Sequence, residues 1–169
     1  MPKMRKPVDA AAIRLLVLDV DGVLTDGRLY FGRRGEALKV FHARDGYGIR
    51  MLIDAGIEVA VISGRRSAAV TARCRELGIA RVIQGAADKA AAFERLRRRA
   101  RVAARDCACI GDDLPDVPLF AVMGLAFAVA DAHADARRAA HYVTALPGGR
   151  GAVREVCDRL LAARARAVR

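Results

Sequence analysis

Hydrophobic and polar positions divide the chain into short apolar runs and longer mixed segments. The apolar runs are rich in Val, Ile and Leu and predict buried strands at residues 14–18, 58–62, 81–84, 107–110, 125–128 and 142–144. The mixed segments are rich in Ala, Arg and Glu and predict helices at residues 47–55, 67–77, 89–100, 115–122, 134–139 and 151–165. This alternation predicts the α/β class, with one doubly wound, mainly parallel sheet.

One segment breaks the alternation. Residues 28–41 contain two extended runs around the turn GRRGE, which predicts an inserted β-hairpin where the first strand-to-helix loop would stand. Such a hairpin lies near the edge at which the parallel strands end, where open α/β sheets bind their ligands. We expect it to act as a flap or as an oligomer contact, and an ordinary protruding hairpin is the alternative.

Length and composition predict one globular domain over residues 1–169. A chain of 169 residues with 54% hydrophobic and 29% charged side chains can bury a core and is not disordered. Its longest apolar stretch, residues 119–130, is shorter than the roughly 20 residues that span a bilayer, so we expect no membrane partner. The N-terminus has no apolar leader, and the four cysteines form no CxxC pair. We therefore expect a cytoplasmic protein.

The net charge of +11 raises the question of a nucleic acid partner. Most of the excess is arginine in residues 95–105 and 150–169, segments that are predicted to be mainly helical. Aromatic residues make up only 5% of the chain and Trp is absent, so the stacking surface of a single-strand binder is missing. Solvated helix faces are the favoured interpretation, and we expect no nucleic acid partner.

The segment LLVLDVDGVLTDG, residues 15–27, ends a predicted buried strand with two acids, Asp19 and Asp21. Carboxylates in an apolar neighbourhood are costly to bury without a cation or a shared proton. Gly22 then permits a tight turn close to a ligand. On its own this pattern indicates phosphoryl chemistry, a nucleotide-sugar site or a metal-binding loop.

A second acidic segment, GDDLPD, follows the strand predicted at residues 107–110. Parallel strands end at a shared edge of the sheet, so we expect Asp112 to meet Asp19 there. Oxygen ligands without His or Cys suit Mg²⁺. Asp113 and Asp116 are interpreted as supporting residues behind this metal site or as charges at a helix N-terminus.

Two further strand ends carry groups that suit a phosphate. The strand at residues 58–62 runs into Ser63, Gly64 and Arg65, where a hydroxyl and a backbone N–H can bind a phosphoryl oxygen. The strand at residues 81–84 leads to Lys89, whose ammonium could neutralise both phosphate and carboxylates at the same edge. Each feature is weak alone, and the order in which they occur gives them their value.

The ordered segments DVDGVLTDG, ISGR, a lone Lys89 and GDDLPD resemble the four motifs of the haloacid dehalogenase superfamily of phosphotransferases. Within it, the segments DVDGVLTDGRLYFG, ARDGYGIR, RCRELGI, VADAHADA and GGRGAVREVC resemble the phosphatases of 3-deoxy-D-manno-octulosonate 8-phosphate. The resemblance implies a Rossmann-like core with an inserted hairpin and no large cap domain. It also implies hydrolysis of this sugar acid phosphate in lipopolysaccharide precursor synthesis. Phosphatases of nine-carbon keto-sugar acid phosphates share much of the pattern and are the alternative.

The resemblance also implies a role for each motif residue. Asp19 would attack phosphorus and form an aspartyl-phosphate, while Asp21 would protonate the leaving sugar oxygen and then activate water. Asp19, Asp112 and the backbone carbonyl of Asp21 would bind Mg²⁺. Ser63 and Lys89 would hold the phosphate oxygens. Ser63 stands where the family often has Thr, and it keeps the hydroxyl.

Without a large cap, another element must cover the substrate. The resemblance implies a homotetramer in which the hairpin and the GGRG segment of neighbouring subunits close the site. We interpret GGRG, residues 148–151, as the mobile hinge of a C-terminal tail over residues 148–169. The alternative is that these glycines only mark the C-terminal end of a helix. Arg65 and Arg73 are candidates for binding the sugar carboxylate, because a guanidinium can pair with it through two hydrogen bonds. A non-catalytic assembly module of the same fold is the contrasting function.

Overall fold

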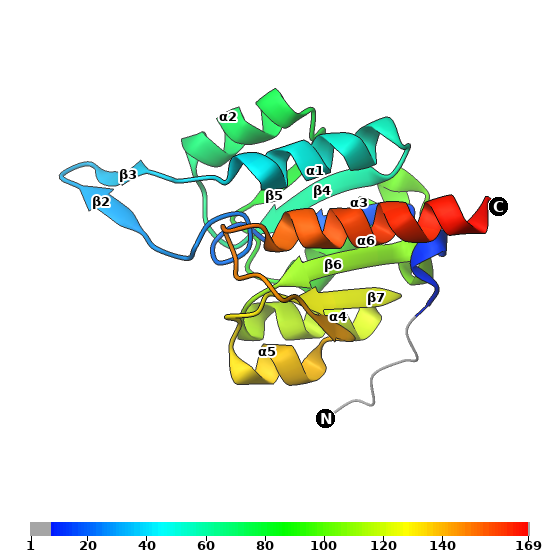
Figure 1. Ribbon diagram of the computed structural model, residues 1–169. Coiled ribbons are helices and arrows are strands. Elements are labelled where there is room, and N and C mark those ends of the chain that lie inside the picture. Colours follow the sequence, from blue (N-terminus) through cyan, green and yellow to red (C-terminus); the bar gives the residue numbers. More distant parts are fainter. Residues whose placement is uncertain (1–7, 169) are drawn as a thin grey trace.

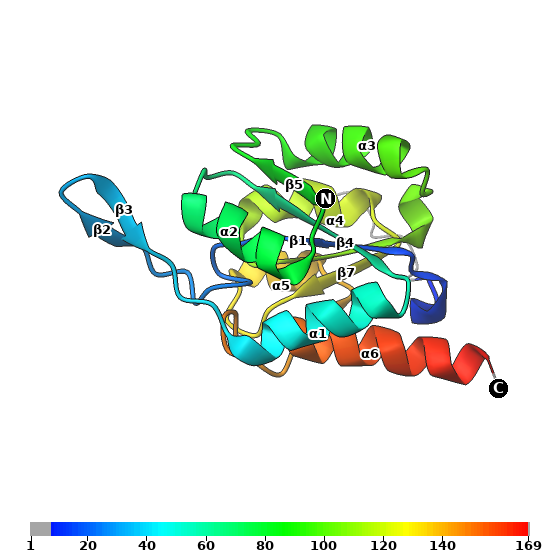
Figure 2. The ribbon, with the colours of Figure 1, turned by 90° about the horizontal axis from the view of Figure 1, so that it is seen from above.

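The computed structural model describes residues 8–168 and has a central parallel sheet with helices on both faces (Figures 1 and 2). The strand order is β5-β4-β1-β6-β7-β8, and all five neighbouring pairs are parallel. The strands are β1 (Leu15–Leu18), β4 (Glu58–Ser63), β5 (Arg81–Gln84), β6 (Cys107–Gly111), β7 (Leu125–Ala128) and β8 (Tyr142–Val143). The predicted α/β class and doubly wound sheet are confirmed. Residues 1–7, where we expect no leader, lie outside the described residues.

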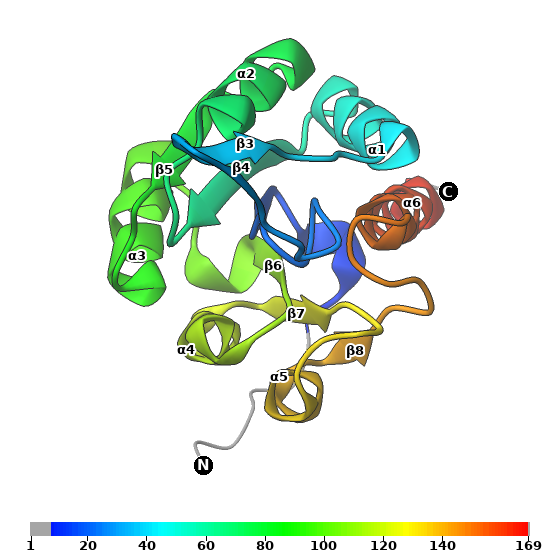
Figure 3. The same ribbon diagram turned by 90° about the vertical axis from the view of Figure 1, so that its left-hand side faces the viewer.

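Among the described residues, three helices lie on each face of the sheet, as Figure 3 lets the reader follow. One face carries α1 (Ala43–Asp54), α2 (Ala68–Leu77) and α6 (Ala152–Ala167), and the other carries α3 (Lys89–Ala100), α4 (Val117–Val122) and α5 (Ala134–Ala139). Short 3₁₀ turns occur at η1 (Ala10–Ala12), η2 (Ala104–Asp106) and η3 (Leu114–Asp116). Within residues 8–168 no helix has the length and hydropathy that a bilayer crossing requires.

The core explains why the strands read as nearly unbroken apolar runs. Both faces of the sheet are covered, so every side chain of β1, β6 and β7 is buried. Phe93, Phe120 and Phe127 are the largest fully buried side chains. Burying this apolar area supplies most of the driving force for folding.

Helix α1 begins at Ala43, four residues earlier than the sequence predicts. Gly46 and Gly48 resemble helix breakers, but the structure uses them for close packing. A Cβ on Gly48 would lie 2.9 Å from Arg154 Cδ and 3.1 Å from Cys157 Cβ, both on α6. The glycines therefore allow α1 to approach its neighbours, which outweighs their low helix propensity.

The N-terminus of α6 is capped by Asp45, a residue of α1. Gly151, the N-cap of α6, has no side chain to offer, and its φ is +111°. The buried Asp45 carboxylate instead accepts hydrogen bonds from the backbone N–H of Arg154, at 2.8 Å, and of Gly151, at 3.4 Å. A carboxylate at this position satisfies free N–H groups and interacts favourably with the helix dipole.

The segment GGRG, interpreted above as a mobile hinge or as helix punctuation, forms a turn that packs closely against neighbouring backbone. A Cβ on Gly148 would lie 1.7 Å from the Gly22 carbonyl oxygen, and one on Gly149 would lie 2.3 Å from Asp26 N. Gly149 N donates to the Val23 carbonyl at 2.9 Å. The turn therefore lies against a loop of its own subunit, where the close approach of two backbones leaves no room for side chains.

The predicted hairpin is present as β2 (Tyr30–Gly32) and β3 (Gly35–Leu38), which form a two-stranded antiparallel sheet. Figure 1 shows it projecting away from the rest of the molecule.

We predict that Asp45→Ala lowers the free energy of unfolding by about 1–3 kcal/mol, because two buried N–H groups lose their acceptor. Asp45→Asn keeps one acceptor oxygen and should recover part of the loss. Urea denaturation measures both effects. The control is Asp158→Ala on the exposed side of α6, which should change stability by less than about 0.5 kcal/mol. Equal losses for Asp45→Ala and Asp158→Ala would contradict the capping role.

Candidate active site

All of the predicted site residues except Arg73 meet at the edge where the parallel strands end. Asp19 follows β1, Ser63 ends β4, and Asp112 follows β6, and these three strands are neighbours in the sheet. A cavity of about 530 Å³ opens there. It is lined by Asp19, Asp21, Gly27, Leu29, Ser63, Gly64, Arg65, Ala86, Ala87, Lys89, Asp112, Asp113, Pro115 and Asp116. A somewhat larger cavity of about 620 Å³, between α2 and β5, has no carboxylate in its lining and so offers no comparable chemistry.

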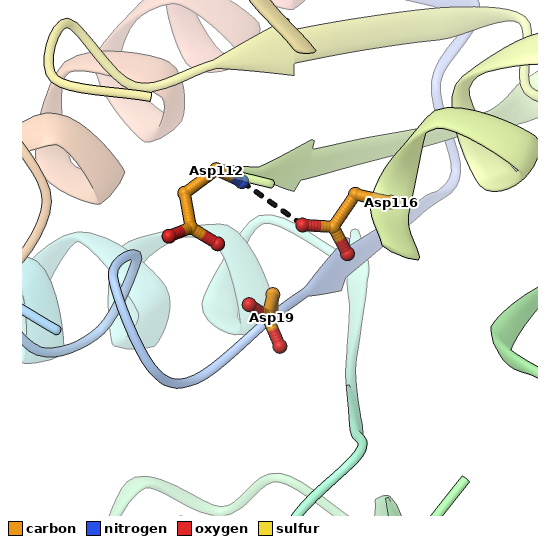
Figure 4. Close-up of side chains that lie close together, drawn as sticks. All are labelled: Asp19, Asp112 and Asp116. Atoms are coloured by element: carbon orange, nitrogen blue, oxygen red, sulfur yellow. Dashed lines mark hydrogen bonds between the residues drawn. The ribbon is translucent and has the colours of Figure 1, made fainter. Parts of the chain in front are cut away.

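Three carboxylates point toward one another in this cavity. Each of Asp19, Asp112 and Asp116 offers one oxygen, and these oxygens lie within 4.8 Å of one another (Figure 4). Lys89 Nζ lies 2.8 Å from Asp19 Oδ1 and 2.6 Å from Asp116 Oδ1. The lysine side chain is buried, so its pairing with two acids compensates for the loss of hydration.

Both carboxylate oxygens of Asp116 accept hydrogen bonds from neighbouring groups. Its Oδ1 accepts from Lys89, and its Oδ2 accepts from the backbone N–H of Asp112 at 2.9 Å and of Asp113 at 3.3 Å. Asp116 therefore fixes both the Lys89 ammonium and the loop that carries Asp112. The Asp113 carboxylate accepts from Leu114 N and begins η3, so it takes the helix-capping role that the sequence offered as one interpretation.

The electrostatics of the cluster are unbalanced without a further cation. Burial, followed by the neighbouring Asp116, raises the pKa of Asp19 to about 6, although Lys89 opposes this shift. Burial together with Asp19 and Asp116 raises the pKa of Asp112 to about 8. Burial lowers the pKa of Lys89, but the two acids it contacts outweigh that effect and raise it. Three acids facing one ammonium leave two negative charges when all are ionised.

The donor set fits a hard divalent cation. Lys89 contacts Asp19 and Asp116 but leaves Asp112 without a cationic side chain in contact, as far as residues 8–168 show. The oxygens of Asp19 and Asp112 that face each other are carboxylate oxygens, the ligands that Mg²⁺ prefers. A divalent ion between them would remove the charge excess and the pKa elevation together.

The loop after Asp19 is shaped for close approach to Asp112. Gly22 has a φ of +86°, and a Cβ on it would lie 2.0 Å from Asp112 Oδ2. Thr25 is buried, and its Oγ1 accepts from the backbone N–H of Gly22 at 3.3 Å and of Gly27 at 3.2 Å. Only glycine combines this conformation with this clearance, which explains the DxDG pattern.

The phosphate-binding candidates on β4 also face the cavity. Ser63 is buried, and its hydroxyl accepts from the backbone N–H of Arg65 at 3.3 Å. The half-exposed Arg65 has its Nε 4.0 Å from Asp21 Oδ2, and its guanidinium lies over the Phe31 ring of the hairpin at 5.7 Å.

The structure does not bring Arg73 to the cavity. Its guanidinium lies 2.9 Å from Glu76 and over the Phe41 ring at 5.9 Å, next to the space that Gly46 leaves. Its assignment to the sugar carboxylate remains a prediction.

The sequence reasoning missed two charged residues of the hairpin. Lys39 Nζ lies 2.5 Å from Asp21 Oδ1 and 3.0 Å from Glu36 Oε2, and the lysine side chain is only 2% exposed. Glu36 in turn accepts a hydrogen bond from Ser67 Oγ. One feature of the sequence could have pointed to Lys39, because it is the one charged residue in the run ALKVF. Its partner could not be read from the sequence.

Comparison with known proteins places these features in context. Residues 76–153 match a family model described as haloacid dehalogenase-like hydrolase. The 3-deoxy-D-manno-octulosonate 8-phosphate phosphatase of Yersinia pestis is 53% identical over 154 residues, 91% of this chain and 82% of that protein.

Solved structures agree with this comparison. The cobalt-bound deoxy-D-mannose-octulosonate 8-phosphate phosphatase of Haemophilus influenzae is 46% identical, with a TM-score of 0.92 over 94% of this chain and 92% of that one. The corresponding enzyme of Moraxella catarrhalis, solved with magnesium ion, phosphate ion and a sugar acid, is 40% identical. Its TM-score is 0.90 over 93% of this chain and 90% of that one.

We predict that the stability of the metal-free protein depends on Asp112. The pKa of Asp112 is about 8 in the folded protein, whereas an ordinary aspartate, as in the unfolded chain, has a pKa of 3.8. Between pH 3.8 and pH 8 the folded protein therefore holds more protons than the unfolded chain. The free energy of unfolding therefore falls as pH rises through this window. Asp112→Asn has no carboxyl group to deprotonate, so its free energy of unfolding should not fall in this way. The variant should therefore become more stable than the wild type as the pH rises from about 5 to 8.

Urea denaturation in chelator measures this difference. Excess Mg²⁺ should stabilise the wild type, more at pH 8 than at pH 6, and should have little effect on Asp112→Asn. Parallel pH profiles for the two proteins would contradict the assignment.

Proposed function

This chain belongs to the haloacid dehalogenase-like hydrolases, in the family that includes the 3-deoxy-D-manno-octulosonate 8-phosphate phosphatases, and we propose that it hydrolyses that sugar acid phosphate. The observation that carries the proposal is the convergence of Asp19, Asp112 and Lys89 at one edge of the sheet. The products are 3-deoxy-D-manno-octulosonate and inorganic phosphate. A place in lipopolysaccharide precursor synthesis is part of the proposal. So is a cytoplasmic location, which fits four buried cysteines that are free thiols.

Two aspartates divide the chemistry. Asp19 lies at the end of β1 with Oδ1 held by Lys89, so its carboxylate is fixed for attack on phosphorus and formation of an aspartyl-phosphate. Asp21 gives a proton to the leaving sugar oxygen. It then takes a proton from the water that hydrolyses the aspartyl-phosphate.

The remaining groups bind and neutralise the phosphate. The Ser63 hydroxyl, the backbone N–H at Gly64 and the Lys89 ammonium line the cavity and would hold its non-bridging oxygens. Asp19, Asp112 and the backbone carbonyl of Asp21 would bind Mg²⁺. The ion supplies positive charge that lets phosphate approach an acidic pocket.

The activation barrier that this site must lower is high. Phosphomonoesters hydrolyse so slowly in water that an enzyme must lower the barrier by more than roughly 20 kcal/mol. No single contact provides that amount. A buried cluster with fixed charges can contribute much of it, because its dipoles are already oriented before the reaction begins.

The sugar acid is the part of the substrate with the fewest assigned contacts. Arg65 lines the cavity and is the stronger candidate for its carboxylate, because the structure holds Arg73 away from the cavity lining. Nine-carbon keto-sugar acid phosphates are the alternative substrates. A direct comparison of turnover on both sugar acid phosphates distinguishes them.

Assembly into a homotetramer is also part of the proposal. The hairpin and its flanks expose a group of large apolar side chains, which are Leu29, Tyr30, Phe31, Leu38 and Val40. Such a group is a feature of a protein–protein contact. Packing of hairpins from neighbouring subunits would cover these side chains and shield the open side of the cavity.

We predict that Asp19→Asn abolishes phosphate release from 3-deoxy-D-manno-octulosonate 8-phosphate, because an amide cannot attack phosphorus. A chelator should abolish it in the wild type, and Mg²⁺ should restore it. A colorimetric phosphate assay measures both. Asp158→Asn, on the exposed side of α6, is the control and should keep wild-type activity. A wild-type protein that releases no phosphate would favour a non-catalytic assembly module instead.

We predict that Phe31→Glu prevents assembly. Phe31 is 62% exposed on the hairpin, and a carboxylate there cannot be buried without a partner. Light scattering after gel filtration should give four subunits for the wild type and fewer for the variant. Val122→Glu places the same charge on an exposed apolar position of α4 and should leave the tetramer intact. A monomeric wild type would contradict the proposed assembly.

A further inference from the structure

Lys39 connects the base of the hairpin to Asp21. It follows β3 directly, and its Nζ lies 2.5 Å from Asp21 Oδ1. The lysine side chain is only 2% exposed. Burying an ammonium is costly unless it is paired, and the Asp21 carboxylate provides that pairing.

A second carboxylate, that of Glu36, forms an ion pair with the lysine. Glu36 Oε2 lies 3.0 Å from Lys39 Nζ, and Glu36 Oε1 accepts from Ser67 Oγ. Ser67 is the N-cap of α2, and its backbone N–H donates to Gln84 Oε1 on β5 at 2.7 Å. The ammonium is thereby held relative to the sheet, even though it belongs to a projecting hairpin.

This arrangement makes the two oxygens of Asp21 unequal. Oδ1 is occupied by Lys39, whereas Oδ2 lies 4.0 Å from Arg65 Nε on the side of the cavity that Arg65 lines. A half-turn of the carboxylate would only exchange its two equivalent oxygens, so one oxygen stays on Lys39 and the other beside Arg65. Oδ2 is therefore the oxygen available for exchange of a proton with a bound molecule.

We propose that Lys39 is a positioning residue for proton transfer by Asp21, holding Oδ1 so that Oδ2 faces the leaving oxygen of the substrate. This role rests on the proposed function. In the first step an Asp19 oxygen bonds to phosphorus, the bond from phosphorus to the sugar oxygen breaks, and the Asp21 Oδ2 proton passes to that oxygen. In the second step a water oxygen bonds to phosphorus, its proton returns to Oδ2, and the bond to Asp19 breaks to release phosphate.

The leaving group of the substrate separates this role from a structural one. A sugar alkoxide is a poor leaving group and needs a proton, whereas p-nitrophenolate departs without one. General acid catalysis contributes typically 10²–10⁴-fold, so misplacing the acid should cost part of that factor for the sugar phosphate alone. Damage to phosphate binding or to the fold would slow both substrates equally.

The experiment measures single-turnover phosphoryl transfer by rapid quench, with the sugar acid phosphate and with p-nitrophenyl phosphate. For Lys39→Met we expect a roughly tenfold to hundredfold loss with the sugar phosphate and less than about threefold with p-nitrophenyl phosphate. Glu36→Gln keeps the Lys39 ammonium but removes the charge of its second partner. This variant should also lose more rate with the sugar phosphate than with p-nitrophenyl phosphate, and its loss should be smaller than that of Lys39→Met. Lys39→Arg keeps a cation and should recover part of the rate.

The matched control is Arg99→Met, which removes a positive charge from an exposed position in the last turn of α3 and should behave as wild type. Gel filtration of each variant checks that assembly is retained. Equal losses on both substrates, or no loss in Lys39→Met, would overturn the role of Lys39. A wild type without activity on the sugar phosphate would instead overturn the proposed function, so the two failures are distinguishable.

Discussion

The crowding of three carboxylates, two of them buried and paired with one ammonium, is the constraint on which the rest of the site depends. Desolvation and mutual repulsion favour protonated acids, and this is visible in the raised pKa values of Asp19 and Asp112. Lys89 compensates part of the charge through two short contacts. A pocket with this remaining imbalance attracts a divalent cation, and the cation in turn makes the pocket able to accept a phosphate.

The cluster of Asp19, Asp112 and Asp116 depends on close backbone packing around it, which glycines permit. Gly22 passes within contact of Asp112, and the turn at Gly148 and Gly149 closes on the loop behind it. That turn is fixed in its own right, since Asp131 accepts from Gly148 N at 2.9 Å and Asp45 caps the helix that follows. Residues distant in the sequence therefore pack directly against the loop that follows Asp21.

The sequence predicts the fold and the central acids well, because both follow from local patterns. Apolar runs locate the strands within one residue at each end, and the parallel order places Asp112 beside Asp19. Asp45 and Lys39 could not be found in this way, because each has its partner in a separate element that only folding brings near. The packing contacts of the GGRG glycines could not be predicted for the same reason, since a hinge and a tight packing contact have the same composition.

The hairpin then has two regions with different physical characters. Its outer part exposes Phe31 and other apolar side chains, whereas its base buries Lys39 between two acids. Arg65 joins the two regions, because its guanidinium lies over the Phe31 ring and near Asp21. A partner that packs on the outer part would therefore restrict the same segment that orients Asp21. In a fold with so small an insertion, the proposed cover of the cavity and the proposed alignment of the acid would both come from one element.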